Sequence, residues 1–168
     1  KFYPEDGRKK KLAKNAIGAA QSGQVNYSRM MRRGDVVAAL LAMSQFISNT
    51  TSMIFLLNKV YAPYYKWQFR ALEKLPILSE IVPLIYELSS IGSTISAWNN
   101  REIVRNHYTI NYSDKKVELV ETIASMLIKE MQRQELTDNN DNYLANHAYS
   151  IMSKIEDEEI RNLHIMGG

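Results

Sequence analysis

The sequence predicts an all-α protein, a bundle of five to seven helices around one long central helix. Only 7 glycines and 4 prolines interrupt its 168 residues, so long helices are allowed. Apolar residues recur at steps of three and four, whereas no stretch alternates with period two for long, as a strand would. An apolar content of 45% with 23% charged residues is typical of a globular domain with one sizeable core.

The first helix is expected to begin at Pro4, because proline is tolerated in a first helical turn and the two acids that follow it are favoured there. We expect this helix to run to about Gln21 and to end near Gly23. A short polar and basic connection with a helical turn of its own should then cover residues 25–33.

The longest predicted helix follows Asp35 and runs to Tyr61, with an apolar seam that steps by four and three. The seam consists of Val36, Leu40, Met43, Ile47, Thr50, Ile54, Leu57 and Tyr61. Residues 36–58 carry no charge over 23 positions and have the length of a membrane span. Hydrocarbon would penalise the polar groups at its centre, so we interpret it as a buried core helix and predict no membrane partner. These groups are Ser44, Gln45, Ser48, Asn49, Thr50, Thr51 and Ser52.

Proline residues divide the middle of the chain into short helices. Pro63 ends or kinks the central helix and suits the first position of the next one, over residues 63–74. Pro76 and Pro83 should bracket a further short helix. Residues 89–100 have the least regular pattern, as expected for a loop or for a short helix.

The last third of the chain predicts three more helices. Ser113 is expected to cap a helix with a seam at Val117, Val120, Ala124, Leu127 and Met131. A polar break at 138–142 precedes a helix over 143–155. An acidic turn and a short terminal helix should follow.

Charge is distributed unevenly along the chain. Residues 1–33 carry nine Lys/Arg against two acids (+7), residues 34–112 carry six against five (+1), and residues 113–168 carry six against eleven (−5). The basic part favours an acidic neighbouring domain, a nucleotide phosphate or nucleic acid as partner, with a solvated helix face as the alternative. The absence of cysteine excludes disulfides and thiol catalysis. Together with the lack of a secretory signal, it leads us to expect a cytoplasmic protein.

Catalytic motifs are missing or incomplete. Gly92-Ser93 resembles the phosphate-holding turn of a nucleotidyltransferase, but no Asp-x-Asp follows to bind Mg²⁺. Neither a P-loop nor GxGxxG is present. The three histidines lack zinc-type spacing, and residues 138–142 lack the glycine and final glutamate of a calcium loop. We therefore expect no metal, no cofactor and no catalytic residue in this domain.

One loose catalytic pattern remains as an alternative. Arg101 and His107 are separated by five residues, a spacing similar to that of a family of small helical ribonucleases. In that family an arginine holds the scissile phosphate and a histidine assists proton transfer. This alternative predicts an RNA-binding or metal-independent ribonuclease-like domain. Ordinary surface or structural roles for both residues stay open.

The densest functional signal is the segment NKVYAPYYKWQFRALEKL at residues 58–75. Rings can stack a base or a sugar, a contact worth about 1–3 kcal/mol per base, and the neighbouring cations can neutralise phosphate. The candidate substrate-binding residues are Asn58, Tyr61, Tyr64, Lys66, Trp67 and Arg70. The alternative is that the rings belong to the core, and Phe69 is the ring we most expect to be buried.

Three blocks of sequence carry a resemblance to a known family. They are FYPEDGRKKKLAKNAIGAAQSGQVNYSRMMRRGD, FLLNKVYAPYYKWQFRALEKLP and NYLANHAYSIMSKIEDEEIRNLHIMGG. Together they resemble an uncharacterised bacterial helical domain found C-terminal to nucleotidyltransferase-like domains of the aminoglycoside-modifying and minimal nucleotidyltransferase type. The resemblance implies that residues 1–168 form a single helical domain, the C-terminal part of a two-domain protein. The upstream domain would supply the missing motifs and bind Mg²⁺ and a nucleoside triphosphate.

The resemblance also implies a function. The chain would be an accessory, substrate-recognition domain of a nucleotidyltransferase, not catalytic alone, that packs on the catalytic domain and forms one wall of the site for a small-molecule acceptor or nucleotide. Its aromatic-basic motif is matched by Tyr61, Tyr64, Lys66, Trp67 and Arg70, and its carboxy-terminal block by His147, Tyr149, Arg161 and His164. A purely structural or homodimerising bundle is the third interpretation.

Overall fold

The computed structural model describes residues 2–167, which form helices and no strand, so the all-α class is confirmed. The α-helices are α1 (Glu5–Ala19), α2 (Tyr27–Arg32), α3 (Val36–Leu57), α4 (Tyr65–Leu72), α5 (Val82–Ser90), α6 (Arg101–Arg105), α7 (Lys115–Arg133), α8 (Leu144–Ser153) and α9 (Glu158–Arg161). The π-helix η1 (Ala20–Asn26) and the 3₁₀ turns η2 (Ser79–Ile81) and η3 (Ile95–Trp98) complete the elements. The chain is divided more finely than predicted because α2, α6 and α9 are short pieces of six, five and four residues.

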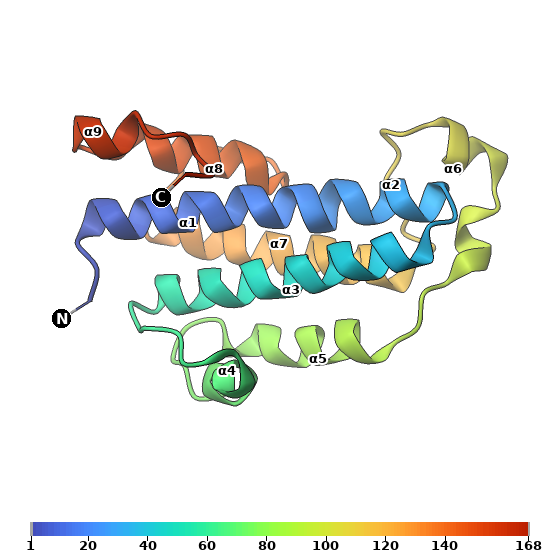
Figure 1. Ribbon diagram of the computed structural model, residues 1–168, viewed down its shortest axis with the longest axis horizontal. Helices are drawn as coiled ribbons and strands as arrows, with labels where there is room; N and C mark the ends of the chain where they lie inside the picture. Colours follow the sequence, from blue (N-terminus) through green and yellow to red (C-terminus); the bar gives the residue numbers. More distant parts are fainter. Residues whose placement is uncertain (1, 168) are drawn as a thin grey trace.

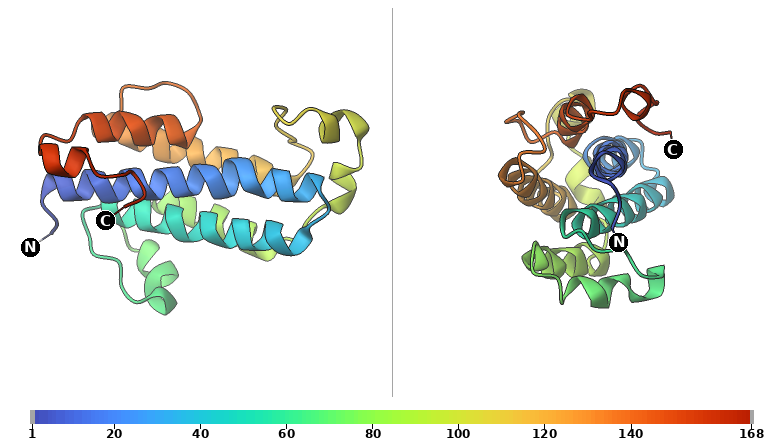
Figure 2. Two further views of the ribbon diagram at one scale, coloured as in Figure 1. Left: turned by 45° about the horizontal axis from the view of Figure 1, so that its top comes forward. Right: turned by 90° about the vertical axis from the view of Figure 1, so that its left-hand side faces the viewer.

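The helices form an elongated bundle. Helices α1 and α2 are joined through η1 into one rod, and α3 runs back antiparallel beside it (Figure 1). Helix α8 packs on α1 on the side away from α3, while α4 and α5 lie beyond α3 (Figure 2). The first and last described segments meet at the same end of the bundle (Figure 1).

The rod from α1 to α2 differs from the sequence-based expectation. Gly23 does not end a helix. The helical turn predicted within residues 25–33 is present, but it extends to Arg32 and continues the helix before it instead of lying in a connection. Gly23 is required for close packing instead, since a Cβ there would lie 2.2 Å from the Phe46 ring. The chain turns at Gly34, whose φ of +74° is one that glycine adopts without strain.

Helix α3 begins as predicted after Asp35, whose carboxylate accepts a hydrogen bond from the Ala38 amide at 2.9 Å. It ends at Leu57, before the predicted end at Tyr61. The predicted seam is buried between Met43 and Leu57, apart from the half-buried Ile47, but its first turn is exposed, with Leu40 at 57%. By length and composition α3 is the one described helix that could cross a membrane, yet 56% of its 18-residue apolar window is buried inside the protein. That burial supports the interpretation as a core helix.

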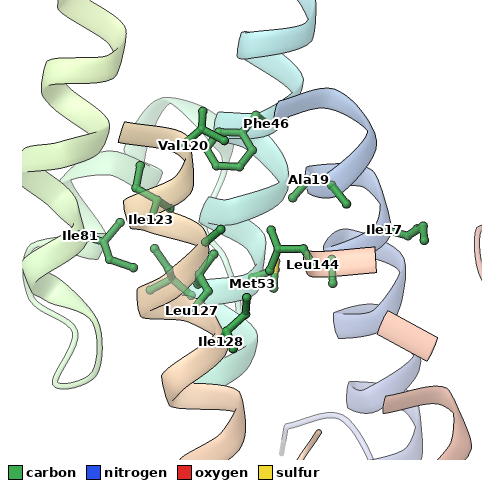
Figure 3. Close-up of a cluster of buried hydrophobic side chains, with 14 of the residues drawn as sticks. Ile17, Ala19, Phe46, Met53, Ile81, Val120, Ile123, Leu127, Ile128 and Leu144 are labelled. Atoms are coloured by element: carbon green, nitrogen blue, oxygen red, sulfur yellow. The ribbon is translucent and has the colours of Figure 1, made fainter. Parts of the chain in front are cut away.

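Helix α7 contributes a row of buried apolar residues to the core. Figure 3 shows Ile123 and Leu127 of α7 between Ile81 on one side and Met53 of α3 on the other. The predicted seam of α7 is confirmed, because every member is at most 5% exposed; its members are Val117, Val120, Ala124, Leu127 and Met131. The predicted cap was one residue early, since Asp114 rather than Ser113 accepts from the Lys116 amide at 2.9 Å.

Pro63 and Pro83 lie at other positions relative to their helices than predicted. Pro63 lies before α4, which begins at Tyr65. Pro83 lies in the first turn of α5 instead of closing a helix between Pro76 and Pro83. A proline has no N–H to lose in a first turn, so this position costs no hydrogen bond.

Candidate functional site

Helix α4 presents aromatic and cationic side chains to solvent. Tyr64 and Trp67 are 64% and 60% exposed, and Lys66 and Arg70 are exposed beside them. We call these four residues the α4 surface. Its rings are not sealed in the core, in contrast to the alternative weighed from sequence.

The opposite side of α4 holds the helix in place. Leu72 is fully buried, and the half-buried Phe69 ring lies 6.3 Å from the ring of Tyr86 on α5. Gln68 donates from Nε2 to the carbonyl of Pro63 at 3.1 Å, which fixes the turn before the helix. Phe69 is therefore the most covered ring of the segment, as expected, although Leu72 is the residue that is wholly enclosed.

Two of the candidate residues lie off the α4 surface. The amide nitrogen of Asn58 donates to the carbonyls of Ile54 and Ile77, both at 2.8 Å, and its oxygen accepts from the Ile77 amide at 2.9 Å. These bonds tie the end of α3 to the segment before α5, so Asn58 has a structural role. Tyr61 is 49% exposed, and its ring centroid lies 4.8 Å from that of Tyr3.

Two basic side chains of α1 are buried inside the protein. Arg8 is 2% exposed and donates to the Glu5 carboxylate at 2.9 Å and to the Leu56 carbonyl at 3.2 Å. This contact lowers the pKa of Glu5. Lys10 is 6% exposed, and burial lowers the pKa of its ammonium. The basic run is thus neither a fully solvated face nor wholly available to a partner.

The alternative pair Arg101 and His107 lies on or just after α6, and both residues are exposed. His107 lines a cavity of about 440 Å³ with Arg29 and Arg32, whereas Arg101 is not among its lining residues. Glu121 lies in the same cavity, where burial raises the pKa of its carboxyl. The structure therefore gives His107 basic neighbours, but they come from α2 and not from Arg101.

The carboxy-terminal block has mainly structural contacts. His147 is fully buried, with Nδ1 2.8 Å from the Thr137 hydroxyl and Nε2 2.7 Å from the Asp141 carbonyl oxygen. A carbonyl oxygen only accepts, so Nε2 carries the proton and Nδ1 accepts from Thr137. Arg161 donates to the Ile155 carbonyl at 3.0 Å. Tyr149 and His164 are exposed.

Metal binding has no preformed site in the part of the chain that the structure describes. No group of three or more His, Asp or Glu side chains there is arranged to hold an ion.

A cavity between α1, η1 and α3 was missed by the sequence analysis. It has a volume of about 510 Å³ and is lined by amide, hydroxyl and ammonium groups together with apolar side chains such as Phe55 and Val60. The signal was present in the polar residues at the centre of α3, which were used only as an argument against a membrane span. Their partners on α1 come from a distant part of the sequence, so periodicity within α3 does not identify them.

One comparison with known proteins is informative. Residues 1–68 match the family described as a domain of unknown function, DUF4037. This part comprises α1 to α3 and the first turn of α4, so it includes Tyr64 and Trp67 but ends before Arg70. None of the curated proteins and none of the solved structures matches the chain. The match marks an uncharacterised helical domain.

Proposed function

We propose that this chain is an accessory, substrate-recognition domain of a nucleotidyltransferase, without transfer activity of its own. The observation that carries the proposal is the α4 surface, where two exposed rings and two cations share two helical turns. Stacking on a ring is worth about 1–3 kcal/mol per base, and Lys66 and Arg70 are placed to neutralise a phosphate. The nucleotidyltransferase context rests on the sequence resemblance.

An apolar strip on α3 supports the presence of a partner domain. Val37, Leu40 and Leu41 are 71%, 57% and 66% exposed. Exposed apolar patches of this kind are typical of contacts with another domain or subunit. In the proposal the strip meets the upstream nucleotidyltransferase-like domain, which binds the nucleoside triphosphate and Mg²⁺ in the cytoplasm. A stable homodimer that covers the strip would favour the dimerising interpretation instead.

Nucleotide titration tests the α4 surface. Trp67 is exposed and Trp98 is 4% exposed, so tryptophan fluorescence reports mainly contacts at Trp67. We expect ATP, GTP, CTP or UTP to quench this fluorescence. The double variant Lys66→Ala/Arg70→Ala should bind the quenching nucleotide about tenfold more weakly, because two charge-assisted contacts are lost.

The matched control is Arg105→Ala/Lys129→Ala, which removes the same two charge types at exposed positions on α6 and α7. An equal loss in both double variants would mean non-specific attraction and would reject the proposed surface. Transfer of a nucleotide by the chain alone would also contradict the proposal. Incubation with labelled RNA without metal tests the alternative, since cleavage that disappears in His107→Ala would favour a ribonuclease.

A further inference from the structure

A concave site lies between α1, η1 and α3, and no residue of the α4 surface lines it. Its volume of about 510 Å³ is in the range of small-molecule sites. The rod contributes Lys11, Lys14, Gln21 and Asn26 to the lining. Helix α3 contributes Gln45, Asn49 and Ser52, which recur at helical spacing and so lie on one face.

Asn49 supplies the observation that points to a ligand. The residue is 9% exposed, and its Nδ2 is buried without a hydrogen-bond partner among the described residues. An unpaired buried amide destabilises the folded state, and native structures keep few of them. A Cβ at Gly18 would lie 2.7 Å from this nitrogen, so glycine leaves the space in which the amide sits. The chain thus keeps an unused donor beside the cavity, on a side chain that belongs to the cavity lining.

The π-helix helps to shape the same wall. Along η1, Gln21, Ser22 and Asn26 line the cavity, while Gln24 reaches the other side and accepts from the Leu144 amide at 2.9 Å. The Ser22 hydroxyl donates to the carbonyl of Gly18 at 2.7 Å. Single π-turns inside longer helices occur frequently at functional sites.

The charges of the cavity select the class of ligand. Lys11 and Lys14 belong to its lining, and no aspartate or glutamate does within residues 2–167. Such a site attracts an anion and has no carboxylate to pair with a polyamine. The neutral amides and hydroxyls on α3 and η1 suit hydroxyl or carbonyl groups.

We propose that this cavity binds a sugar phosphate, either free or as part of a nucleotide. The phosphate would lie at the lysine end, and a rotation of the Asn49 side-chain amide would bring its Nδ2 to a hydroxyl or ring oxygen of the sugar. This inference does not depend on the α4 surface, because Lys66 and Arg70 are not among the lining residues.

Amide NMR of the full 168-residue chain tests the proposal with ribose 5-phosphate, AMP, ribose and inorganic phosphate as probes. We expect ribose 5-phosphate to shift the side-chain amide of Asn49 and the backbone amides of Gly18 and Ser22. It should bind at least about tenfold more tightly than ribose or phosphate. Affinities are read from the shifts of Asn49 and Gly18, which line the cavity. A lower Kd for AMP than for ribose 5-phosphate at these residues would assign the nucleotide, and an equal or higher Kd would assign the free sugar phosphate.

Variants separate binding from folding. Asn49→Leu should weaken ribose 5-phosphate binding about tenfold or more, while its melting temperature stays the same or rises because an unpaired buried donor is removed. Lys11→Gln should weaken binding by about three- to tenfold, whereas Lys129→Gln, which removes an exposed lysine on α7, should not.

Three outcomes would overturn the proposal. The first is the absence of shifts at Asn49 with every probe at about 10 mM, which corresponds to negligible affinity. The second is that inorganic phosphate alone gives the same shifts as ribose 5-phosphate, because the sugar would then contribute nothing to binding. The third is unaltered binding by Asn49→Leu or an equal loss in Lys11→Gln and Lys129→Gln.

Discussion

The carboxylate of Asp114 receives hydrogen bonds from three separate elements. The Tyr27 hydroxyl on α2 lies 2.6 Å away and the Trp98 indole nitrogen on η3 2.9 Å away, while the Lys116 amide closes the first turn of α7. Asp114 is fully buried and Tyr27 is too. A charge-assisted hydrogen bond is stronger than a neutral one, so this single residue ties the amino-terminal rod to the C-terminal half.

The Tyr27 contact should make the free energy of unfolding fall as the pH rises into the alkaline range. Burial, and then the hydrogen bond to Asp114, raise the pKa of Tyr27 above its ordinary value of 10.0. Above that pH the unfolded chain has lost a proton that the folded chain keeps, so each further rise in pH favours unfolding. At neutral pH we expect Tyr27→Phe to cost about 1–3 kcal/mol of unfolding free energy. The difference in melting temperature between wild type and variant should shrink above pH 10.

Melting curves followed by circular dichroism from about pH 8 to 11 measure this effect. The control is Tyr149→Phe, since Tyr149 is 59% exposed and should melt like the wild type at every pH. A difference between wild type and Tyr27→Phe that stays constant across pH 10 would contradict the raised pKa.

At the scale of elements, sequence periodicity predicts buried faces well where a helix is covered along its length. The seam of α7 was predicted in full because the helix is enclosed by its neighbours. The predicted buried seam of α3 is wrong at Leu40, because the first turn of α3 lies on the surface. Periodicity reports that a helix has an apolar face, and only the packing decides how much of it is covered.

The rod from α1 to α2 shows why the prediction of a helix end near Gly23 was wrong. A glycine after a polar stretch commonly marks a helix end, but Gly23 is buried against a ring 23 positions along the chain, that of Phe46. Nothing within one helix distinguishes these two uses of glycine. The distinction depends on a residue of another element.

Gly23→Ala tests this role of Gly23. The new methyl would collide with Phe46, so we expect a loss of about 1–3 kcal/mol in unfolding free energy, although alanine is the better helix former by about 1 kcal/mol. Urea unfolding measures the change. Gly7→Ala is the matched control, because a Cβ there meets nothing within 4 Å, and it should stabilise the protein by up to about 1 kcal/mol. Stabilisation by both changes would show that the Phe46 contact does not constrain the rod.

At the scale of the whole molecule, the sequence left open whether the rings of α4 are exposed, and it did not indicate where the basic charge of α1 lies. The rings and cations of α4 are local to one short helix, so their pattern indicates a shared surface. The cavity between α1 and α3 depends on Gly18 and Asn49, which meet only after the rod and α3 pack together. Lys10 was counted as part of a basic face, but it bonds to residues more than 150 positions away.

Lys10 joins the two ends of the molecule. Its ammonium donates to the carbonyls of His164, Ile165 and Gly167 at 2.9, 2.8 and 2.7 Å. Short helix α9 also touches α1. We expect the Lys10 ammonium to contribute to the order of the segment after α9.

Hydrogen exchange on Lys10→Met tests whether that cation orders the C-terminal segment. Methionine keeps much of the apolar stem but leaves the carbonyls without a donor, so the free energy of opening the segment should fall by about 2 kcal/mol, and its amides should exchange roughly 30-fold faster. The amides of Met166 and Gly167 report the change, since both are hydrogen-bonded within the segment. Lys9→Met is the matched control, because Lys9 donates instead to the carbonyl of Lys154 at 2.9 Å, at the end of α8. Equal acceleration in both variants would mean that the segment is ordered by general attraction to α1 and not by the Lys10 ammonium.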